Sequence, residues 1–196
     1  MNVLHLVGAA PYRTNCFLLI SEEKRALVID PGIPAKEIDK ILEERGAKLA
    51  LILLTHGHFD HVVGVEELAK EWDCPVYLDP ADVKGDELYP VSMDTLPYHE
   101  DQPIELDDIK ITPIYTPGHS QGSWLLRCRN FVFCGDTLFA GSAGRTDMEG
   151  GSRQQQRESL KRFKELPLDP ETHLLPGHGA FTTLEEELEM NPYLMF

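Results

Sequence analysis

Residues 55–61 read Thr55-His56-Gly57-His58-Phe59-Asp60-His61, which places four potential metal ligands within six residues. The stretch directly follows Leu49–Leu54, a continuous apolar run of the length expected for a strand that is buried on both faces. Open α/β sheets bind ligands where strands end, and so many imidazoles rarely gather without a metal ion. The stretch therefore predicts a metal site at the end of a buried strand.

Three later segments have the same layout, in which an apolar strand is followed by His or Asp among small residues that permit close backbone approach. They are Thr116-Pro117-Gly118-His119 after Ile109–Tyr115, Gly135-Asp136-Thr137 after Phe131–Cys134, and Pro176-Gly177-His178-Gly179 after Thr172–Leu175. Each segment alone is weak evidence, because a single His after a strand is usually incidental. Together with the first stretch they give seven candidate ligands: His56, His58, Asp60, His61, His119, Asp136 and His178.

Seven His and Asp ligands exceed what one tetrahedral ion can use, whereas they suit two ions about 3.5–4 Å apart that share a carboxylate. Imidazole together with carboxylate favours zinc, iron or manganese over calcium or magnesium. We expect two divalent metal ions and favour zinc among these metals. Such ions would lower the pKa of a shared water toward neutrality, so that a metal-bound hydroxide could attack a carbonyl carbon.

Strand and helix signals are mixed along the chain, and no repeat or linker divides it. We expect one layered α/β domain over residues 1–196, with sheets that are only partly parallel. The expected strands are Val3–Val7, Cys16–Ile20, Ala26–Ile29, Leu49–Leu54, Pro75–Leu78, Ile109–Tyr115, Ser123–Leu126, Phe131–Cys134 and Thr172–Leu175. The expected helices are Ala35–Arg45, Val65–Trp72, a segment from about Gln156 to Glu165, and Thr183–Met190. The polar segment Asp79–Glu100 is interpreted as a surface excursion.

Composition disfavours several kinds of partner. The formal net charge of −15 argues against nucleic acids and anionic membranes, because their phosphates repel an acidic surface. No apolar run approaches the roughly 20 residues that cross a bilayer. The N-terminus lacks the pattern of a signal peptide, so we expect a cytoplasmic protein that acts on a small molecule. None of the four cysteines forms a CxxC pair, and we expect buried, reduced thiols.

The motif HxHxDH, followed at a distance by His, Asp and His, extends over nearly the whole chain and resembles the metallo-β-lactamase superfamily. Within it, the sequence looks most like the short, single-domain bacterial members of the glyoxalase II (hydroxyacylglutathione hydrolase) branch. This likeness is carried by Ile29-Asp30-Pro31-Gly32, Gly135-Asp136-Thr137-Leu138-Phe139, Gly144-Arg145-Thr146-Asp147 and Asn191-Pro192-Tyr193-Leu194. The resemblance implies an αββα sandwich with a metal site at one edge, between the sheets. It also implies that His56, His58 and His119 bind one ion, that Asp60, His61 and His178 bind the second, and that Asp136 bridges both.

The resemblance further implies hydrolysis of a thioester of the S-lactoylglutathione type. A thiolate with a conjugate-acid pKa of about 8.5 leaves without a strong general acid, and the motifs supply no dedicated one. Asp60 could donate a proton only if the second ion were absent. Arg145 stands where the family has a basic residue near the substrate, so we expect it to meet a substrate carboxylate through a bidentate contact. Full-length glyoxalase II enzymes carry a C-terminal helical domain that binds glutathione, and we expect this chain, which ends at Phe196, to lack it.

Two other functions stay open at this point. A persulfide dioxygenase of the same fold would bind one iron through His56, His119 and Asp136, although Pro176-Gly177-His178-Gly179 is typical of the glyoxalase branch. A non-enzymatic metal-binding module is the second alternative, and the absence of Cys from the ligand motifs argues against it. A serine hydrolase that uses Ser120 or Ser123 is disfavoured, because the sequence has no GxSxG elbow.

The remaining polar residues have ordinary interpretations. Asp30 either orients a ligand histidine from behind or opens the tight turn at Pro31-Gly32, and the sequence favours neither. His5, His99 and His173 match no motif and are expected to be ordinary surface or core histidines. Glu185–Glu187 is interpreted as a solvated helix face.

Overall fold

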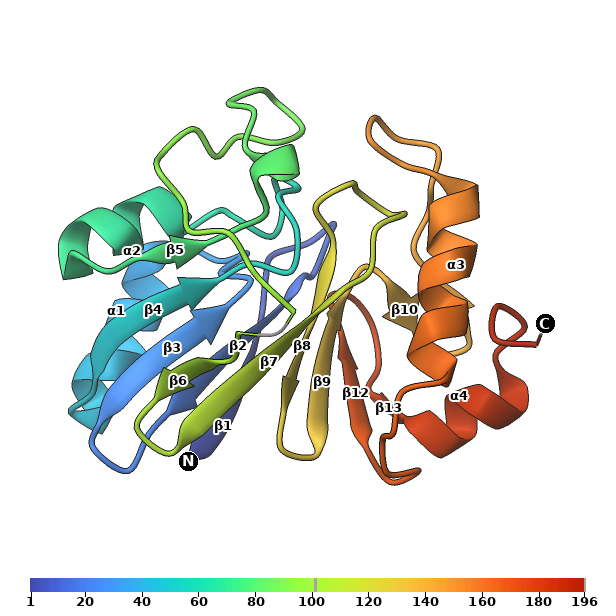
Figure 1. Cartoon of the computed structure of the whole chain (residues 1–196). Helices are drawn as coiled ribbons and strands as arrows, with labels where there is room; N and C mark the ends of the chain where they lie inside the picture. Colours follow the sequence, from blue (N-terminus) through green and yellow to red (C-terminus); the bar gives the residue numbers. More distant parts are fainter. Residues whose placement is uncertain (101, 196) are drawn as a thin grey trace.

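Two β-sheets pack face to face in this computed structural model, which describes residues 1–100 and 102–195 (Figure 1). The five-stranded sheet has the order β1-β2-β3-β4-β5 and consists of β1 (Asn2–Val7), β2 (Asn15–Ile20), β3 (Arg25–Ile29), β4 (Lys48–Leu53) and β5 (Val76–Tyr77). The six-stranded sheet has the order β13-β12-β9-β8-β7-β6 and consists of β6 (Ile104–Leu106), β7 (Ile109–Tyr115), β8 (Trp124–Cys128), β9 (Phe131–Gly135), β12 (His173–Pro176) and β13 (Thr182–Thr183). A small hairpin pairs β10 (Leu138–Phe139) with β11 (Ser142–Ala143).

Helices cover the outer face of each sheet (Figure 1). The helices α1 (Ala35–Arg45) and α2 (Val65–Trp72) lie on the five-stranded sheet, and α3 (Arg153–Lys164) and α4 (Leu184–Met190) lie on the six-stranded sheet. Both sheets are mixed, because β3, β4 and β5 run parallel, as do β9 and β12, while the other neighbours are antiparallel. This arrangement confirms the αββα sandwich that the resemblance implies.

Alternation of side chains along the strands divides the apolar core into three layers. In β2, Cys16, Leu18 and Ile20 pack toward α1 and α2, whereas Phe17 and Leu19 point between the sheets. In β9, the outward residues pack against α3 and α4 while Phe133 joins Phe17 between the sheets, with the two ring centroids 5.0 Å apart. A strand buried on both faces explains why these segments read as unbroken apolar runs.

The sequence predicts the long elements well and the short ones poorly. The observed bounds of α1 and α2 coincide with the predicted ones, and α1 is followed by Gly46, whose φ of 61° suits glycine. The strands β6, β10, β11 and β13 were not predicted, since two or three residues are too few to show a period.

The structure adds detail to one expectation about a polar segment and contradicts another. Asp79–Glu100 is not merely a surface excursion, because it contains a 3₁₀ turn at Pro80–Asp82 and buries the side chains of Asp82, Tyr89 and Tyr98. Glu187 is buried rather than solvated. Its carboxylate accepts hydrogen bonds from the Gly141 amide, the Thr182 hydroxyl and the Asn191 side-chain amide. These donors offset the cost of burying the carboxylate.

The burial of the cysteines and the character of the helices match what the composition predicts. All four cysteines are buried and free, as expected, and burial raises the pKa of the Cys74 thiol to about 11. Within the described part of the chain, no helix has both the length and the apolar character that are needed to cross a membrane.

Candidate metal centre

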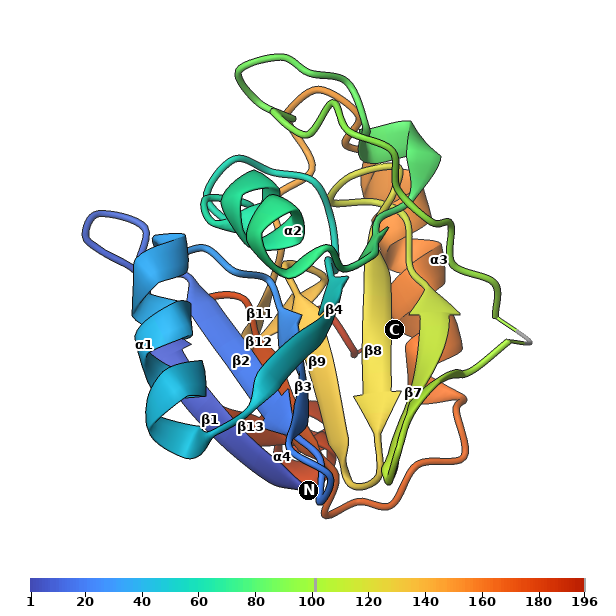
Figure 2. The same ribbon diagram turned by 90° about the vertical axis from the view of Figure 1, so that its left-hand side faces the viewer.

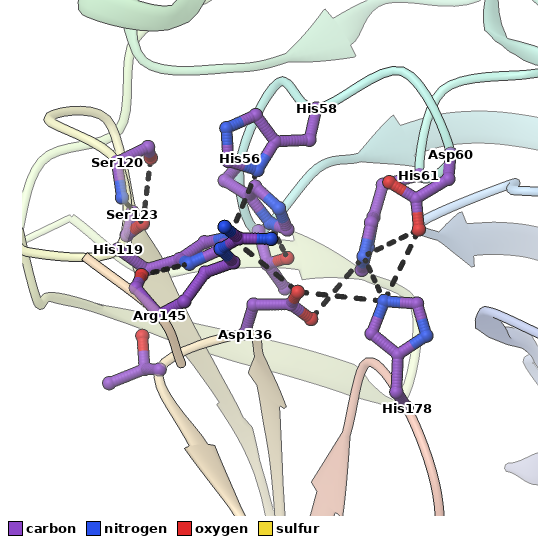
Figure 3. Close-up of polar contacts among 12 residues, drawn as sticks. His56, His58, Asp60, His61, His119, Ser120, Ser123, Asp136, Arg145 and His178 are labelled. Carbon is purple, nitrogen blue, oxygen red and sulfur yellow. Dashed lines mark hydrogen bonds and ion pairs between the residues drawn. The ribbon is translucent and has the colours of Figure 1, made fainter. Parts of the chain in front are cut away.

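The seven candidate ligands converge at one edge of the sandwich (Figure 3). The loop after β4 carries His56, His58, Asp60 and His61, and His119 lies between β7 and β8. Asp136 directly follows β9, and His178 follows β12. The five-stranded sheet thus supplies four of these residues and the six-stranded sheet supplies three, so the cluster joins the two layers.

His56, His58 and His119 form one cluster, called here the three-histidine group, in which the potential ligand atoms all lie within 4.8 Å of one another. His58 Nδ1 lies 2.9 Å from His119 Nε2. The Nδ1 of His119 donates to the carbonyl of Arg145 at 2.8 Å. In the neutral ring, Nε2 is therefore unprotonated, and its lone pair faces the cluster.

Asp60, His61 and His178 form a second cluster, the Asp60 group, with ligand atoms within the same 4.8 Å of one another. His178 Nε2 lies 3.2 Å from Asp60 Oδ2 and 3.3 Å from His61 Nε2. The Nδ1 of His61 donates to Asp30, and the Nδ1 of His178 donates to the carbonyl of Tyr12 at 2.9 Å. Both rings therefore direct an Nε2 lone pair into the cluster when they are neutral.

Asp136 lies between the two groups. Its Oδ1 is 3.4 Å from His61 Nε2, and its Oδ2 is 3.5 Å from His119 Nε2 and from His178 Nε2. The Oδ1 atom is buried and has no hydrogen-bond partner among the described residues, and the same holds for His56 Nε2. The Nδ1 of His56 is 3.1 Å from the Thr55 hydroxyl, whose proton is donated to Asp30. Nδ1 of His56 is therefore the donor to this hydroxyl, and Nε2 of the neutral ring carries a free lone pair.

Opposing lone pairs and an unpartnered buried carboxylate oxygen are costly by themselves. A cation that sits among them satisfies all of them at once. The donor set of imidazole nitrogens and carboxylate oxygens also suits a divalent transition metal. The residues present therefore fit the metal ions that the sequence predicts.

The two groups differ in the charge of their histidines. Burial, together with the neighbouring histidines, lowers the pKa of His56 well below its ordinary value and lowers that of His58 to about 3, so both rings are neutral at neutral pH. Burial also lowers the pKa of His178, but Asp136 and Asp60 outweigh it and raise the pKa to about 9. For His61, Asp136 and Asp30 likewise outweigh burial and raise the pKa. The Asp60 group is thus an anionic environment that attracts positive charge.

Comparison of the chain with known proteins shows the family to which it belongs. The model of the Metallo-beta-lactamase superfamily matches residues 9–178. The chain belongs to this superfamily. It is 33% identical over 200 residues to the "Probable metallo-hydrolase YqgX" of Bacillus subtilis, covering 94% of this chain and 93% of the relative. It is 30% identical over 216 residues to the "Hydroxyacylglutathione hydrolase GloC" of Haemophilus influenzae, covering 99% and 98%.

A solved member of the superfamily, described as "TTHA1623 in a di-iron-bound form", superposes with a TM-score of 0.81 at 34% identity, covering 97% of this chain and 100% of that one. The family, the two named relatives and the His/Asp clusters together support a metal-dependent hydrolase. The metal of the solved relative is iron, so the donor set does not single out zinc.

Asp30 fills both roles that the sequence left open. Its φ of 49° and the hydrogen bond from the Gly32 amide to its carbonyl form the tight turn. Its carboxylate accepts from the Thr55 amide at 2.7 Å, from the Thr55 hydroxyl at 2.6 Å and from His61 Nδ1 at 3.0 Å. Although Asp30 lies within reach of His56 and His61, its oxygens face these donors, so it holds the His61 ring from behind.

Sequence reasoning missed two residues at the start of β2, Thr14 just before the strand and Asn15 within it, that support the site. The hydroxyl of Thr14 donates to Asp60 Oδ2 at 2.8 Å. Asn15, its neighbour, donates through its side-chain amide to the carbonyls of Pro176 and Gly179, on both sides of His178. These residues are more than 40 positions from their partners in the chain. Since no local motif marks such long-range contacts, the sequence alone offered no signal for them.

The other residues considered from the sequence lie as follows. Arg145 is exposed and forms hydrogen bonds of 2.7 and 2.8 Å with Asp147. Ser120 and Ser123 are buried, and their hydroxyls lie 2.7 Å apart. The Ser120 hydroxyl donates to the carboxylate of Asp82 and not to an imidazole, so it lacks the histidine base of a serine hydrolase. His5 bonds to the side chain of Asn15, and His173 stacks on Phe131, so both have structural contacts.

Proposed function

We propose that this protein hydrolyses a small acyl thioester, of the hydroxyacylglutathione type, at a centre of two divalent metal ions. The three-histidine group would hold one ion, the Asp60 group would hold the other, and Asp136 would bridge them. Zinc remains our first choice, with iron or manganese as the alternatives. Ions at this site would supply a nucleophilic water at neutral pH and polarise the substrate carbonyl.

We choose a thioester as the substrate because of the protonation state of the carboxylates of Asp136 and Asp60. Burial raises the pKa of Asp136, but the neighbouring His61 and His178 outweigh it and hold the pKa well below its ordinary value. The pKa of Asp60 is also lowered, because hydrogen bonds from His178 and Thr14 and the charge of His61 outweigh burial. In the metal-free site both carboxylates are therefore ionised at neutral pH, and as metal ligands they would likewise carry no proton for a leaving group. A thiolate needs no such proton, whereas an amine does.

The protein's own side chains fix the ligands and meet the substrate. Thr14 orients the carboxylate of Asp60, and Asp30 holds His61 in the tautomer whose Nε2 is free. Arg145 is the candidate anchor for a substrate carboxylate, if its pairing with Asp147 opens. The acidic surface argues against nucleic acids and anionic membranes as partners. The relative named as a hydroxyacylglutathione hydrolase supports the substrate class.

A matched substrate panel tests the proposal. Purified protein reconstituted separately with zinc, iron and manganese is assayed on S-lactoylglutathione, on the oxygen ester and on the amide of the same acyl group. We expect the thioester to be cleaved with the highest kcat, and the amide to be cleaved negligibly. Amide cleavage at a comparable rate would contradict the proposal. So would oxygen uptake with glutathione persulfide in the absence of thioester hydrolysis, which would indicate a dioxygenase.

A further inference from the structure

Asp82 is a buried carboxylate that the proposed hydrolysis does not use. It lies on the 3₁₀ turn Pro80–Asp82, in the segment after β5 that passes over the edge of the sheets where β4 ends (Figures 1 and 2). Only 1% of the residue is exposed. Burying a carboxylate is costly unless hydrogen bonds replace its water, so its partners show what it holds in place.

Three donors surround the carboxylate of Asp82. The Gly57 amide donates to Oδ2 at 3.0 Å, the Ser120 hydroxyl donates to Oδ2 at 2.7 Å, and the Gly122 amide donates to Oδ1 at 3.0 Å. Ser123 extends this set, because its hydroxyl oxygen accepts from the Ser120 amide at 3.1 Å and lies 2.7 Å from the Ser120 hydroxyl.

The donors belong to the two loops that carry the three-histidine group. Gly57 separates His56 from His58, and Ser120 directly follows His119. One carboxylate therefore ties the loop after β4 to the loop before β8, at the residues next to all three histidines. The Asp60 group has other supports, namely Thr14, Asp30 and the carbonyl of Tyr12.

The backbone around Asp82 leaves no room for larger residues. A Cβ atom on Gly57 would lie 2.6 Å from the carbonyl oxygen of Asp82, and one on Gly122 would lie 2.6 Å from its Cγ. Both distances are too short for real contacts, so the two glycines let the ligand loops close onto the carboxylate. The turn itself is fixed by Asp79, which accepts from the Ala81 amide and from Trp124 Nε1, each at 2.9 Å.

We propose that Asp82 is a positioning residue for the metal ion of the three-histidine group. It sets the separation of the two loops, so that His58 Nδ1 and His119 Nε2 face the same ion. The inference rests on the proposed metal ligands and is independent of the substrate. Without the carboxylate the loops lose their common acceptor, and the three nitrogens are no longer held in place for one ion.

The test is a metal titration of the full chain carrying Asp82→Asn. The amide has the same shape, but its NH₂ group must face one of the three donors, so at least one hydrogen bond is lost. Binding of Zn²⁺ is measured in competition with a chromophoric chelator, and Co²⁺ binding by its visible absorption. We expect one of the two binding steps to weaken by about 10- to 100-fold, the range for residues that orient ligands. The other step should weaken less, because the Asp60 group has its own supports in Thr14, Asp30 and the carbonyl of Tyr12.

Companion variants assign the affected ion and separate positioning from general damage. His58→Ala should remove the same Co²⁺ absorption component that Asp82→Asn weakens. Thr14→Val, which removes a partner of Asp60, should weaken the other component. Glu187→Gln is the matched control, because it alters a second buried carboxylate with three donors, outside the cluster. It should lower the unfolding temperature and leave both binding steps unchanged.

Specific results would overturn the inference. They are equal weakening of both steps in Asp82→Asn, unchanged binding of both ions, or a loss in Glu187→Gln that matches the loss in Asp82→Asn. If Asp82→Asn does not fold, Ser120→Ala removes one of the three bonds, and the same step should weaken by about 2- to 10-fold; an unchanged step would then reject the inference. Failure of the unmodified protein to bind any metal would instead contradict the proposed function, so the two failures are distinguishable.

Discussion

The guanidinium of Arg145 forms two hydrogen bonds with the carboxylate of Asp147, at 2.7 and 2.8 Å, on the exposed surface next to the metal centre. A substrate carboxylate that binds Arg145 must displace this partner. We therefore expect Arg145→Ala to raise KM for glutathione thioesters by less than about fivefold, as for an exposed ion pair, with kcat unchanged. Asp147→Asn should lower KM, since the arginine is then free. A neutral thioester without carboxylates is the control, and equal effects on both substrates would contradict this role of Arg145.

Asp136 contacts histidines of both groups, which predicts an unequal effect of ligand substitutions. Asp136→Ala should reduce bound metal from two ions to below one per chain, whereas His61→Ala should retain about one. The loss of kcat in Asp136→Ala should exceed the roughly 100-fold that is typical of residues which only orient a ligand. Elemental analysis after dialysis, together with kcat, provides the measurement. Equal metal content in Asp136→Ala and the unmodified protein would show that Asp136 is no bridge.

Metal affinity should depend on pH in the Asp60 group more than in the three-histidine group. The raised pKa of His178, about 9, means that the metal-free ring is protonated below pH 9, and this proton must leave when metal binds. The affinity of that ion should therefore rise by about tenfold per pH unit for each proton displaced, and level off above about pH 9. His56 and His58, whose pKa values are lowered, have no proton to lose there. Calorimetry in buffers of different ionisation enthalpy counts the protons released, and pH-independent binding of both ions would contradict the argument.

Gly177 makes room for the cluster. A Cβ atom at this position would lie 2.3 Å from Asp136 Oδ1 and 2.6 Å from His61 Cε1. Gly177→Ala should therefore abolish binding of at least one ion. Gly46→Ala is the control, because that glycine has a φ of 61° and open space around it. It should cost about 1–2 kcal/mol of folding free energy without changing metal content. Full metal content in Gly177→Ala would indicate that the loop can move aside.

The sequence predicted the parts of this molecule that repeat a short pattern. The apolar period of Ala35–Arg45 and the unbroken run Leu49–Leu54 report burial directly, and the seven candidate ligands lie in local motifs at strand ends. The resemblance to a known family then supplied the order of the layers. These predictions succeed because the information lies within a few consecutive residues.

Tertiary supports of the site could not be predicted in this way. Thr14 reaches Asp60 across 46 positions, and Asp82 contacts residues 25 to 40 positions away. Neither belongs to a motif, and an isolated Asp before Val83 reads as part of a solvated loop. Burial of such a group depends on how distant loops pack together, and this packing leaves no periodic pattern in the sequence. The same reason explains why Glu187 was mistaken for a surface residue.

Each proposed ion takes ligands from both sheets, since His119 joins the loop after β4 at one ion and His178 joins it at the other. The ions would therefore act as removable cross-links between the two layers of the sandwich. A ligand that binds only the folded chain stabilises it by about 2.7 kcal/mol at a free concentration 100 times its Kd. The unfolding temperature should follow the free metal concentration. Metal supply would then govern the lifetime of the folded chain as well as its activity, so that scarcity of metal would expose the protein to proteolysis.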